Sequence, residues 1–200
     1  MDLKANISKE ELSACPVETF NGKTYVIQTL FDTEKAVDFL RTQGVVGFDT
    51  ETKPSFRKGK SNQVALLQIS TEDICFLFRL NVIGIPPVLS DFLKDTAVKK
   101  IGLSLRDDFR ALGKRAPIEP TNFIDLQEYV KTFGIGENSL TKIYAILFGK
   151  RISKAQRLSN WESAILTERQ VEYAALDAWA TRRIFVYLDS MRTQMSHDNI

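Results

Sequence analysis

The chain has 200 residues, of which 44% are hydrophobic, and a formal net charge of +2. This length and composition suit one globular domain with a sizeable core, and the charge is too small to indicate a nucleic-acid-binding protein by itself. No apolar run approaches the roughly 20 residues that cross a bilayer, and the polar start MDLKANISKEEL lacks the apolar core of a signal peptide. With two distant cysteines and no disulfide framework, the sequence predicts a soluble cytoplasmic protein without a membrane partner.

The pattern of apolar residues predicts strands followed by alternating strands and helices. Ser8 and Glu11 form a capping box that begins a short helix. A helix over 32–43 is expected to be capped by Asp32 or Thr33 and to end at Gly44. Strands are expected at 23–30, 45–51, 63–70, 74–78, 98–103 and 122–124, and further helices at 86–94 and 105–114, from residue 125 and from residue 167.

The strands at 63–70 and 74–78 are joined by the short polar turn TED, which predicts an antiparallel hairpin. A hairpin followed by strands that alternate with helices predicts a mixed sheet covered by helices, an α/β architecture. We expect an N-terminal extension with a short helix (1–21), one main domain (22–192) and a polar tail (193–200).

Two carboxylates, Asp49 and Glu51, end the apolar strand at 45–51. Side chains alternate across a strand, so both carboxylates project from one face. Neighbouring carboxylates repel each other and raise each other's pKa unless a cation lies between them. A divalent ion that prefers oxygen ligands, Mg²⁺ or Mn²⁺, fits such a pair. A pair of solvated acids at the end of a strand is the alternative that these two residues leave open.

The C-terminal helix carries a third carboxylate on its apolar face. Thr167 and Gln170 form a capping box, and an apolar stripe at helical spacing follows. Asp177 lies in the middle of this stripe, with Tyr173 one turn earlier on the same face. A buried aspartate is costly unless it is paired or bound to a cation, so Asp177 either binds a metal or forms a salt bridge with an arginine at the edge of the core.

Asp107 and Asp108 open the helix at 105–114, where the helix dipole favours acidic side chains. Capping accounts for one of them, which leaves the other free to face elsewhere. Asp125 is predicted to be the N-cap of the next helix and is given no catalytic role.

Two stretches without acidic residues carry many of the cations of this nearly neutral chain. They predict positive patches beside a negative site, and ordinary solvated faces are the alternative. Residues 52–71 contain Lys53, Arg57, Lys58 and Lys60, and residues 138–161 contain Lys142, Lys150, Arg151, Lys154 and Arg157.

Three motifs taken in order resemble those of the DEDD superfamily of 3′→5′ exonucleases, tyrosine subtype. They are FDTET (48–52), IGLSLRDDFRAL (101–112) and YAALDAWA (173–180). The stretch that surrounds the last motif resembles the end of ribonuclease D and Werner-type exonuclease domains, and the similarity extends over about residues 22–190. Each motif alone is weakly specific, whereas the ordered set is specific. The resemblance implies a ribonuclease-H-like mixed sheet of five strands covered by helices.

The resemblance also implies roles for individual residues. Asp108 is selected over Asp107 because the family's aspartate is followed by three residues and then leucine, as in DFRAL. Tyr173 matches the tyrosine that orients the attacking water. The implied reaction is hydrolysis of phosphodiester bonds from the 3′ end of a nucleic acid by two metal ions, with release of nucleoside 5′-monophosphates. The implied ligands of these Mg²⁺ or Mn²⁺ ions are Asp49, Glu51, Asp108 and Asp177, with Asp49 between the two ions.

The implied partner is the single-stranded 3′ end of DNA or RNA. Phe56 either stacks on a terminal base or packs in the core. Three alternative functions remain open: a binding module of the same fold without catalysis, a nuclease that cuts within a strand, and a structural metal-binding protein. The cations predicted to follow the nucleic-acid backbone are Lys150, Arg151, Lys154 and Arg157.

Overall fold

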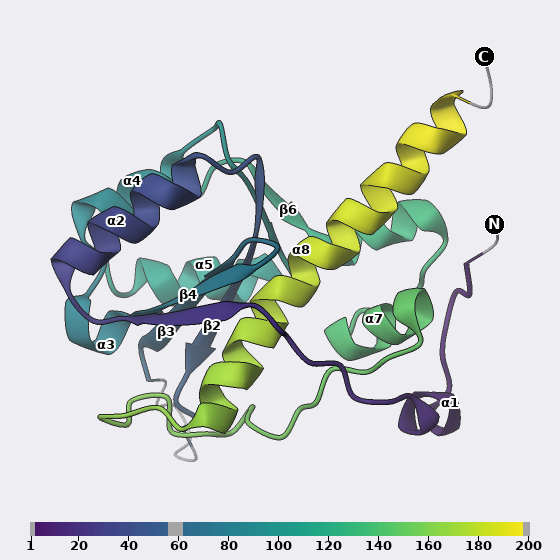
Figure 1. Ribbon diagram of the computed structural model, residues 1–200, viewed down its shortest axis with the longest axis horizontal. Helices are drawn as coiled ribbons and strands as arrows, with labels where there is room; N and C mark the ends of the chain where they lie inside the picture. The colour runs from purple at the N-terminus through teal and green to yellow at the C-terminus, as the bar shows by residue number, and fades with distance from the viewer. Residues whose placement is uncertain (1–2, 56–61, 198–200) are drawn as a thin grey trace.

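The computed structural model describes residues 3–55 and 62–197. Its centre is a mixed sheet of six strands in the order β1-β4-β3-β2-β5-β6 (Figure 1). The sheet has the six strands that the pattern of apolar residues predicts, one more than the five that the resemblance implies, and the three-residue β6 pairs with β5 at its edge. The strands are β1 (Lys23–Ile27), β2 (Val45–Thr52), β3 (Val64–Ser70), β4 (Ile74–Arg79), β5 (Lys99–Gly102) and β6 (Phe123–Asp125).

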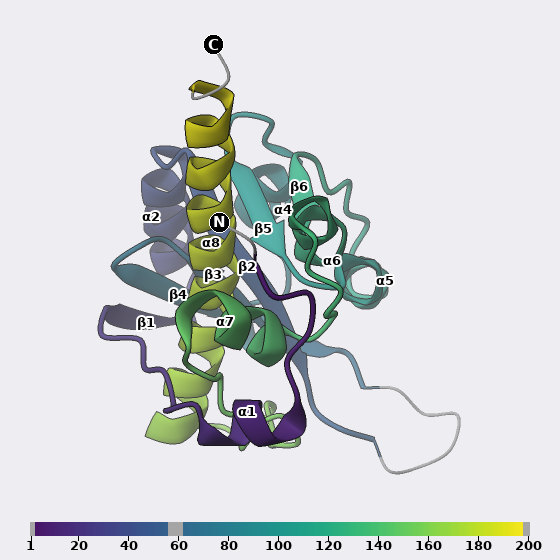
Figure 2. The ribbon, with the colours of Figure 1, turned by 90° about the vertical axis from the view of Figure 1, so that its right-hand side faces the viewer.

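Helices cover both faces of the sheet, which confirms the predicted α/β architecture. On one face, α2 and α4 lie side by side (Figure 1) over a core that includes Leu40, Phe48 and Phe92. On the other face, α8 runs diagonally across the strands (Figure 1), and α7 packs against it (Figure 2). The helices are α1 (Lys9–Ala14), α2 (Leu30–Arg41), α3 (Leu80–Ile83), α4 (Pro87–Lys94), α5 (Leu105–Gly113), α6 (Leu126–Tyr129), the 3₁₀ helix η1 (Val130–Phe133), α7 (Leu140–Phe148) and α8 (Glu168–His197).

The strand pairing places β2 inside the sheet. β2 is antiparallel to β3 and parallel to β5. β3 and β4 form the predicted antiparallel hairpin, and every residue of β3 is buried. Within the described part of the chain, none of the helices is both long enough and apolar enough to cross a membrane.

The start of α2 differs from the prediction. The N-cap is Thr29, whose hydroxyl accepts a hydrogen bond from the backbone N–H of Asp32 at 3.1 Å, and β1 therefore ends before residue 28. The first two residues of α2, Leu30 and Phe31, are 59% and 63% exposed. These apolar side chains do not belong to the buried stripe of α2, so the helical pattern does not include them. In the sequence they therefore look like a continuation of the preceding strand. The short α3 after β4 was not predicted.

Candidate active site

β2 lies against the middle of α8 at Gly47, the third residue of the strand. A Cβ atom at this position would lie 1.8 Å from the carbonyl oxygen of Ala178, so only glycine lets the helix approach the strand this closely. Thr181 fixes the same contact, because its hydroxyl donates to the backbone of β5 at 2.8 Å and accepts from the backbone of β2 at 3.3 Å. The contact brings Asp177 of α8 to Asp49, which lies two residues after Gly47 on the same face of β2.

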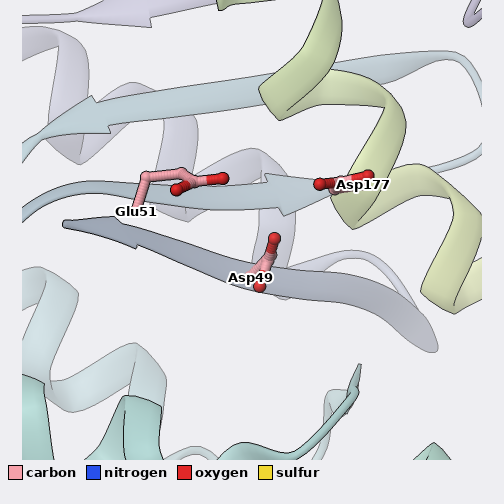
Figure 3. A group of neighbouring side chains, drawn as sticks. All are labelled: Asp49, Glu51 and Asp177. Carbon is pink, nitrogen blue, oxygen red and sulfur yellow. The ribbon is translucent and has the colours of Figure 1, made fainter. Parts of the chain in front are cut away.

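Asp49, Glu51 and Asp177 form an acidic cluster at this contact. Each offers a carboxylate oxygen, and these oxygens all lie within 4.8 Å of one another. Figure 3 shows the two carboxylates of β2 and the one of α8 turned toward one another. Glu51 and Asp177 are only 8% and 7% exposed. Buried oxygen donors at this spacing form a candidate metal site.

Asp108 lies in the first turn of α5, outside the group of three carboxylates whose oxygens lie within 4.8 Å of one another. Its carboxylate accepts a hydrogen bond from the hydroxyl of Thr50, and its charge acts on both Asp49 and Glu51. By contrast, the side chain of Asp107 is 80% exposed and pairs with Arg110 on the same helix. Of the two neighbouring aspartates, Asp108 is thus the one whose charge acts on the cluster.

Asp125 fixes the helix turn from which Asp108 projects. It is the N-cap of α6, as predicted, and accepts a hydrogen bond from the backbone N–H of Gln127. The same carboxylate also accepts hydrogen bonds from the backbone N–H groups of Ser104 and Leu105, each at 2.9 Å. These two donors belong to the start of α5, so one aspartate caps two helices.

Burial and mutual repulsion disfavour the charged forms of the clustered carboxyl groups. Burial, together with the charges of Asp177 and Asp108, raises the pKa of Glu51 to about 9. Burial and the same two charges, with that of Glu51, raise the pKa of Asp49 well above its usual value. Burial also raises the pKa of Asp108 to about 6, although the hydrogen bond from Thr50 opposes this shift. Such a cluster gains stability from any bound cation.

Asp177 is the member of the cluster with a neighbouring cation. Burial raises its pKa to about 7, while the hydrogen bond from Tyr173 and the charge of Lys154 act in the opposite direction. The interactions of Asp177 therefore run to a phenol and a lysine on the α7–α8 connection, rather than to an arginine at the edge of the core.

These shifts predict that the metal-free protein is destabilised as the pH rises. The folded-state pKa of Asp177, about 7, is above its ordinary value of 3.8, so stability that is present below pH 3.8 is lost as the pH rises through 7. Asp177→Asn removes this loss. We expect the variant to unfold about 5 °C higher than wild type at pH 8 in EDTA, and the gain to shrink at pH 5.

Thermal unfolding at the two pH values measures this difference, and Asp107→Asn is the matched control. Asp107 carries the same charge in an exposed position, so its replacement should leave the unfolding temperature within about 1 °C of wild type. An equal gain for Asp177→Asn at pH 5 and pH 8 would show that the ionisation of Asp177 does not limit stability.

Tyr173 lies one turn before Asp177 and donates a hydrogen bond to it. Its ring packs against the fully buried Trp161, with 6.0 Å between ring centroids and 37° between the planes. Burial, followed by the charges of Asp177 and Glu51, raises the pKa of Tyr173. The phenol therefore keeps its proton and is held in a fixed orientation beside the carboxylates.

A cavity of about 290 Å³ opens beside Tyr173 and Asp177. Lys154 and Arg157, both exposed, line this cavity from the connection between α7 and α8. Two of the four cations predicted to follow a nucleic-acid backbone thus lie next to the acidic cluster. Phe56, the predicted stacking residue, lies outside the described residues.

Lys150 and Arg151 have different surroundings. The ammonium group of Lys150 lies 2.9 Å from a carboxylate oxygen of Glu18, and the Nε atom of Arg151 donates to the carbonyl oxygen of Cys15 at 3.1 Å. Neither residue lines the cavity beside Tyr173. The structure therefore separates these two cations from Lys154 and Arg157, although all four are close in the sequence.

Sequence analysis missed three residues that position the site: Gly47, Thr181 and Thr50. The signal for Gly47 was present, since a glycine inside a buried strand often marks a close approach of another backbone. Thr50 and Thr181 carry no such signal, because their roles depend on partners far away in the sequence.

A mixed sheet covered by helices, with an acidic cluster at its centre, is the arrangement expected of a ribonuclease-H-like nuclease. Comparison with known families identifies the family. The sequence profile of the 3′-5′ exonuclease family matches residues 25–192. The chain belongs to this family, which confirms the resemblance identified from its three motifs.

Among individual proteins, the bifunctional 3′-5′ exonuclease/ATP-dependent helicase WRN of Mus musculus is 31% identical over 153 residues. The match covers 74% of this chain but only 11% of the mouse protein. The crystal structure of the Nibbler EXO domain of Aedes aegypti has a TM-score of 0.77 at 22% identity and covers 92% of this chain and 95% of that one. Trypanosoma brucei RNase D in complex with RNA U12 has a TM-score of 0.73 at 19% identity, with coverage of 92% and 66%. At these identities the two structures establish the shared fold.

Proposed function

We propose that this protein is a divalent-metal-dependent 3′→5′ exonuclease. It hydrolyses phosphodiester bonds from the 3′ end of a nucleic acid by a two-metal-ion mechanism and releases nucleoside 5′-monophosphates. The observation that supports this proposal most directly is the cluster of Asp49, Glu51 and Asp177, whose oxygens lie within 4.8 Å of one another, next to the phenol of Tyr173. The family to which the chain belongs gives this cluster its chemical context.

The carboxylates would hold Mg²⁺ or Mn²⁺. All the candidate donors are carboxylate oxygens, which suit these hard ions. The raised pKa values of the cluster, which follow from burial and from neighbouring negative charges, indicate a site that favours a cation. When bound, a pair of such ions supplies an activated water and neutralises the charge that develops on the phosphate. The proposed ligands are Asp49, Glu51, Asp108 and Asp177.

Tyr173 would orient the attacking water. Because burial and the adjacent carboxylates raise its pKa, the phenol stays protonated and is poorly suited to act as a base. Its packing against Trp161 and its hydrogen bond to Asp177 fix the position of the hydroxyl. Its contribution is therefore the alignment of the water.

The cavity beside Tyr173 would receive the single-stranded 3′ end of DNA or RNA. Lys154 and Arg157 line this cavity and supply positive charge for backbone phosphates. The RNA bound by the structurally similar Trypanosoma RNase D supports a nucleic-acid substrate. Phe56 remains the proposed stacking residue. Lys154 and Arg157 are the cations for which we retain phosphate binding, since Lys150 and Arg151 contact the N-terminal segment.

Replacement of Lys154 and Arg157 together with alanine should weaken substrate binding and leave the chemical step intact. We expect KM to rise. We also expect the slope of log KM against log salt concentration to fall by about 1.4, which corresponds to the loss of two phosphate contacts on a single strand. The value of kcat should remain within about twofold of wild type, because binding shared by ground state and transition state is what is lost.

The control for this variant is the double replacement of Lys94 and Lys131 with alanine. These cations form exposed ion pairs with Glu119 and Glu128 and do not line the cavity, so the control changes net charge equally. Its KM and salt slope should match wild type. A collapse of kcat at unchanged KM in the Lys154/Arg157 variant would instead place these cations in the transition state.

The function itself is tested by degradation of 5′-end-labelled single-stranded DNA, single-stranded RNA and recessed duplexes, with Mn²⁺ and with EDTA. We expect ladders that shorten from the 3′ end in Mn²⁺, with nucleoside 5′-monophosphates as products, and intact substrate in EDTA. Cleavage of a circular single strand would identify a nuclease that cuts internally. Binding without degradation in Mg²⁺ and in Mn²⁺ would identify a non-catalytic binding module.

A further inference from the structure

Glu18 is a buried carboxylate outside the acidic cluster. It is 4% exposed, which makes it the most buried carboxylate residue among the described residues, ahead of Asp177 at 7% and Glu51 at 8%. Its two oxygens accept hydrogen bonds from the hydroxyl of Tyr144 at 2.8 Å and from Lys150 and Arg183 at 2.9 Å each. A buried carboxylate with this many donors is costly to disrupt, because removing it leaves the donors without an acceptor.

The donors of Glu18 come from three parts of the fold that follow one another in the sequence. Tyr144 belongs to α7, Lys150 to the α7–α8 connection and Arg183 to α8. Burial acts to raise the pKa of Glu18, but the hydrogen bonds from Lys150 and Tyr144 outweigh this effect and hold the pKa below its usual value. The carboxylate therefore stays charged and joins the N-terminal segment to both helices.

The backbone around Glu18 makes a second connection to the same region. We call residues 15–18 the N-terminal clamp. Its backbone bonds to Arg151 in both directions: the Glu18 N–H donates to the Arg151 carbonyl at 3.0 Å, and the Arg151 N–H donates to the Pro16 carbonyl at 2.9 Å. The guanidinium of Arg151 also donates to the Cys15 carbonyl. The backbone of the clamp thus holds both the backbone and the side chain of Arg151.

The residues held by the clamp lead directly to the cavity beside Tyr173. Ile152 is bonded in both directions to the hydroxyl of Thr141 at the start of α7, at 2.9 and 3.0 Å. Lys154 and Arg157 follow and line the cavity, and the ammonium of Lys154 donates a long hydrogen bond of 3.4 Å to the hydroxyl of Ser139. The backbone held at 151–152 is thus one of the contacts that set the positions of these two cations.

We propose that Glu18 is a positioning residue for substrate binding: through the N-terminal clamp it holds the α7–α8 connection so that Lys154 and Arg157 face the 3′ end at Asp177. This inference rests on the proposed exonuclease function. The clamp lies outside the part of the chain that matches the family profile, which begins at residue 25.

The experiment compares Glu18→Gln and Glu18→Ala with wild type and with Glu10→Gln. Glu10 is an exposed residue of the N-terminal helix, so its replacement makes the same change in charge on the same segment. We expect Glu18→Ala to raise KM on a single strand about tenfold and to flatten its salt slope by about 0.7 to 1.4, as one or two phosphate contacts are lost. Glu18→Gln should have a smaller effect of the same sign. Values of kcat and the affinity for Mn²⁺, measured by calorimetry, should match wild type.

A double-mutant cycle distinguishes positioning from general destabilisation. When Lys154 and Arg157 are both alanine, Glu18→Ala should raise KM no further, because the cations that it positions are absent. The inference would be overturned if the effects of Glu18→Ala and of the double replacement on KM were additive. It would also be overturned if Glu18→Ala lowered the unfolding temperature and left KM unchanged. Wild type that fails to degrade any of the nucleic acids in Mn²⁺ would instead overturn the proposed function, which separates the two failures.

Hydrogen exchange provides a readout that does not depend on activity, and Tyr144→Phe provides a milder variant if Glu18→Ala does not fold. This change keeps the buried ring and removes only the hydroxyl that bonds Glu18. We expect faster amide exchange at residues 150–157 in Tyr144→Phe and in Glu18→Gln than in wild type. If both variants exchanged these amides at the wild-type rate, the clamp would not hold the α7–α8 connection.

Discussion

Asp49→Asn is expected to abolish degradation in Mg²⁺ and in Mn²⁺ while the protein remains folded. The carboxylate oxygens of Asp49, Glu51 and Asp177 lie within 4.8 Å of one another, and in the proposed mechanism Asp49 would help to hold the metal ions. An amide has nearly the same shape but lacks the charge that holds a divalent cation. The substitution also removes one of the mutually repelling charges, so the metal-free variant should be at least as stable as wild type.

Three measurements check this expectation. Degradation of an end-labelled single strand gives the rate, calorimetry with Mn²⁺ gives the affinity, and thermal unfolding in EDTA gives the stability. Asp107→Asn is the control, because Asp107 is an exposed neighbour of Asp108 that does not face the cluster. Turnover at the wild-type rate by Asp49→Asn, or by wild type in excess EDTA, would contradict the two-metal proposal.

The parts of the site that the sequence predicts are those set by local periodicity. Asp49 and Glu51 are two residues apart on a strand, and Tyr173 and Asp177 are four residues apart on a helix, so each pair shares a face wherever the rest of the chain lies. The structure shows both pairs in this arrangement. The mixed sheet and its central hairpin follow from the same kind of local pattern.

The meeting of these two pairs depends on tertiary contacts that local patterns do not specify. α8 reaches β2 because Gly47 leaves room for the backbone at Ala178, and α5 is oriented because Asp125 caps it. Helix capping alone could not choose between Asp107 and Asp108. The resemblance of the motifs selects Asp108, and the structure places its carboxylate at the hydroxyl of Thr50.

The basic stretch after α7 shows where sequence patterns fail. Lys150 and Arg151 face the N-terminal clamp, whereas Lys154 and Arg157 face the cavity. The chain from 150 to 157 forms neither a helix nor an extended strand, so its side chains have no period from which their directions could be predicted. The positive charge that these four residues share therefore predicted one common role, whereas the fold places two of them at the N-terminal clamp and two at the cavity.

Tyr173→Phe is expected to keep the fold and metal binding but to lose turnover. The ring still packs against Trp161, while the hydroxyl that would orient the water is gone. One positioned hydrogen-bonding group typically contributes about 10²- to 10⁴-fold to the rate, so kcat should fall by this factor. KM for a single strand should change little. Tyr187→Phe, which alters another tyrosine of α8 that does not line the cavity, should have wild-type kinetics.

The pH dependence of this variant separates two ways in which Tyr173 could act. The hydroxyl also lowers the pKa of Asp177, which burial raises to about 7, so its loss makes Asp177 harder to ionise. If Tyr173 acted only through this ionisation, the variant would recover wild-type turnover at pH 9, where the carboxyl group loses its proton in both proteins. If it orients the water, the loss in kcat should persist at pH 9 with saturating Mn²⁺, and this persistence is the result that we expect.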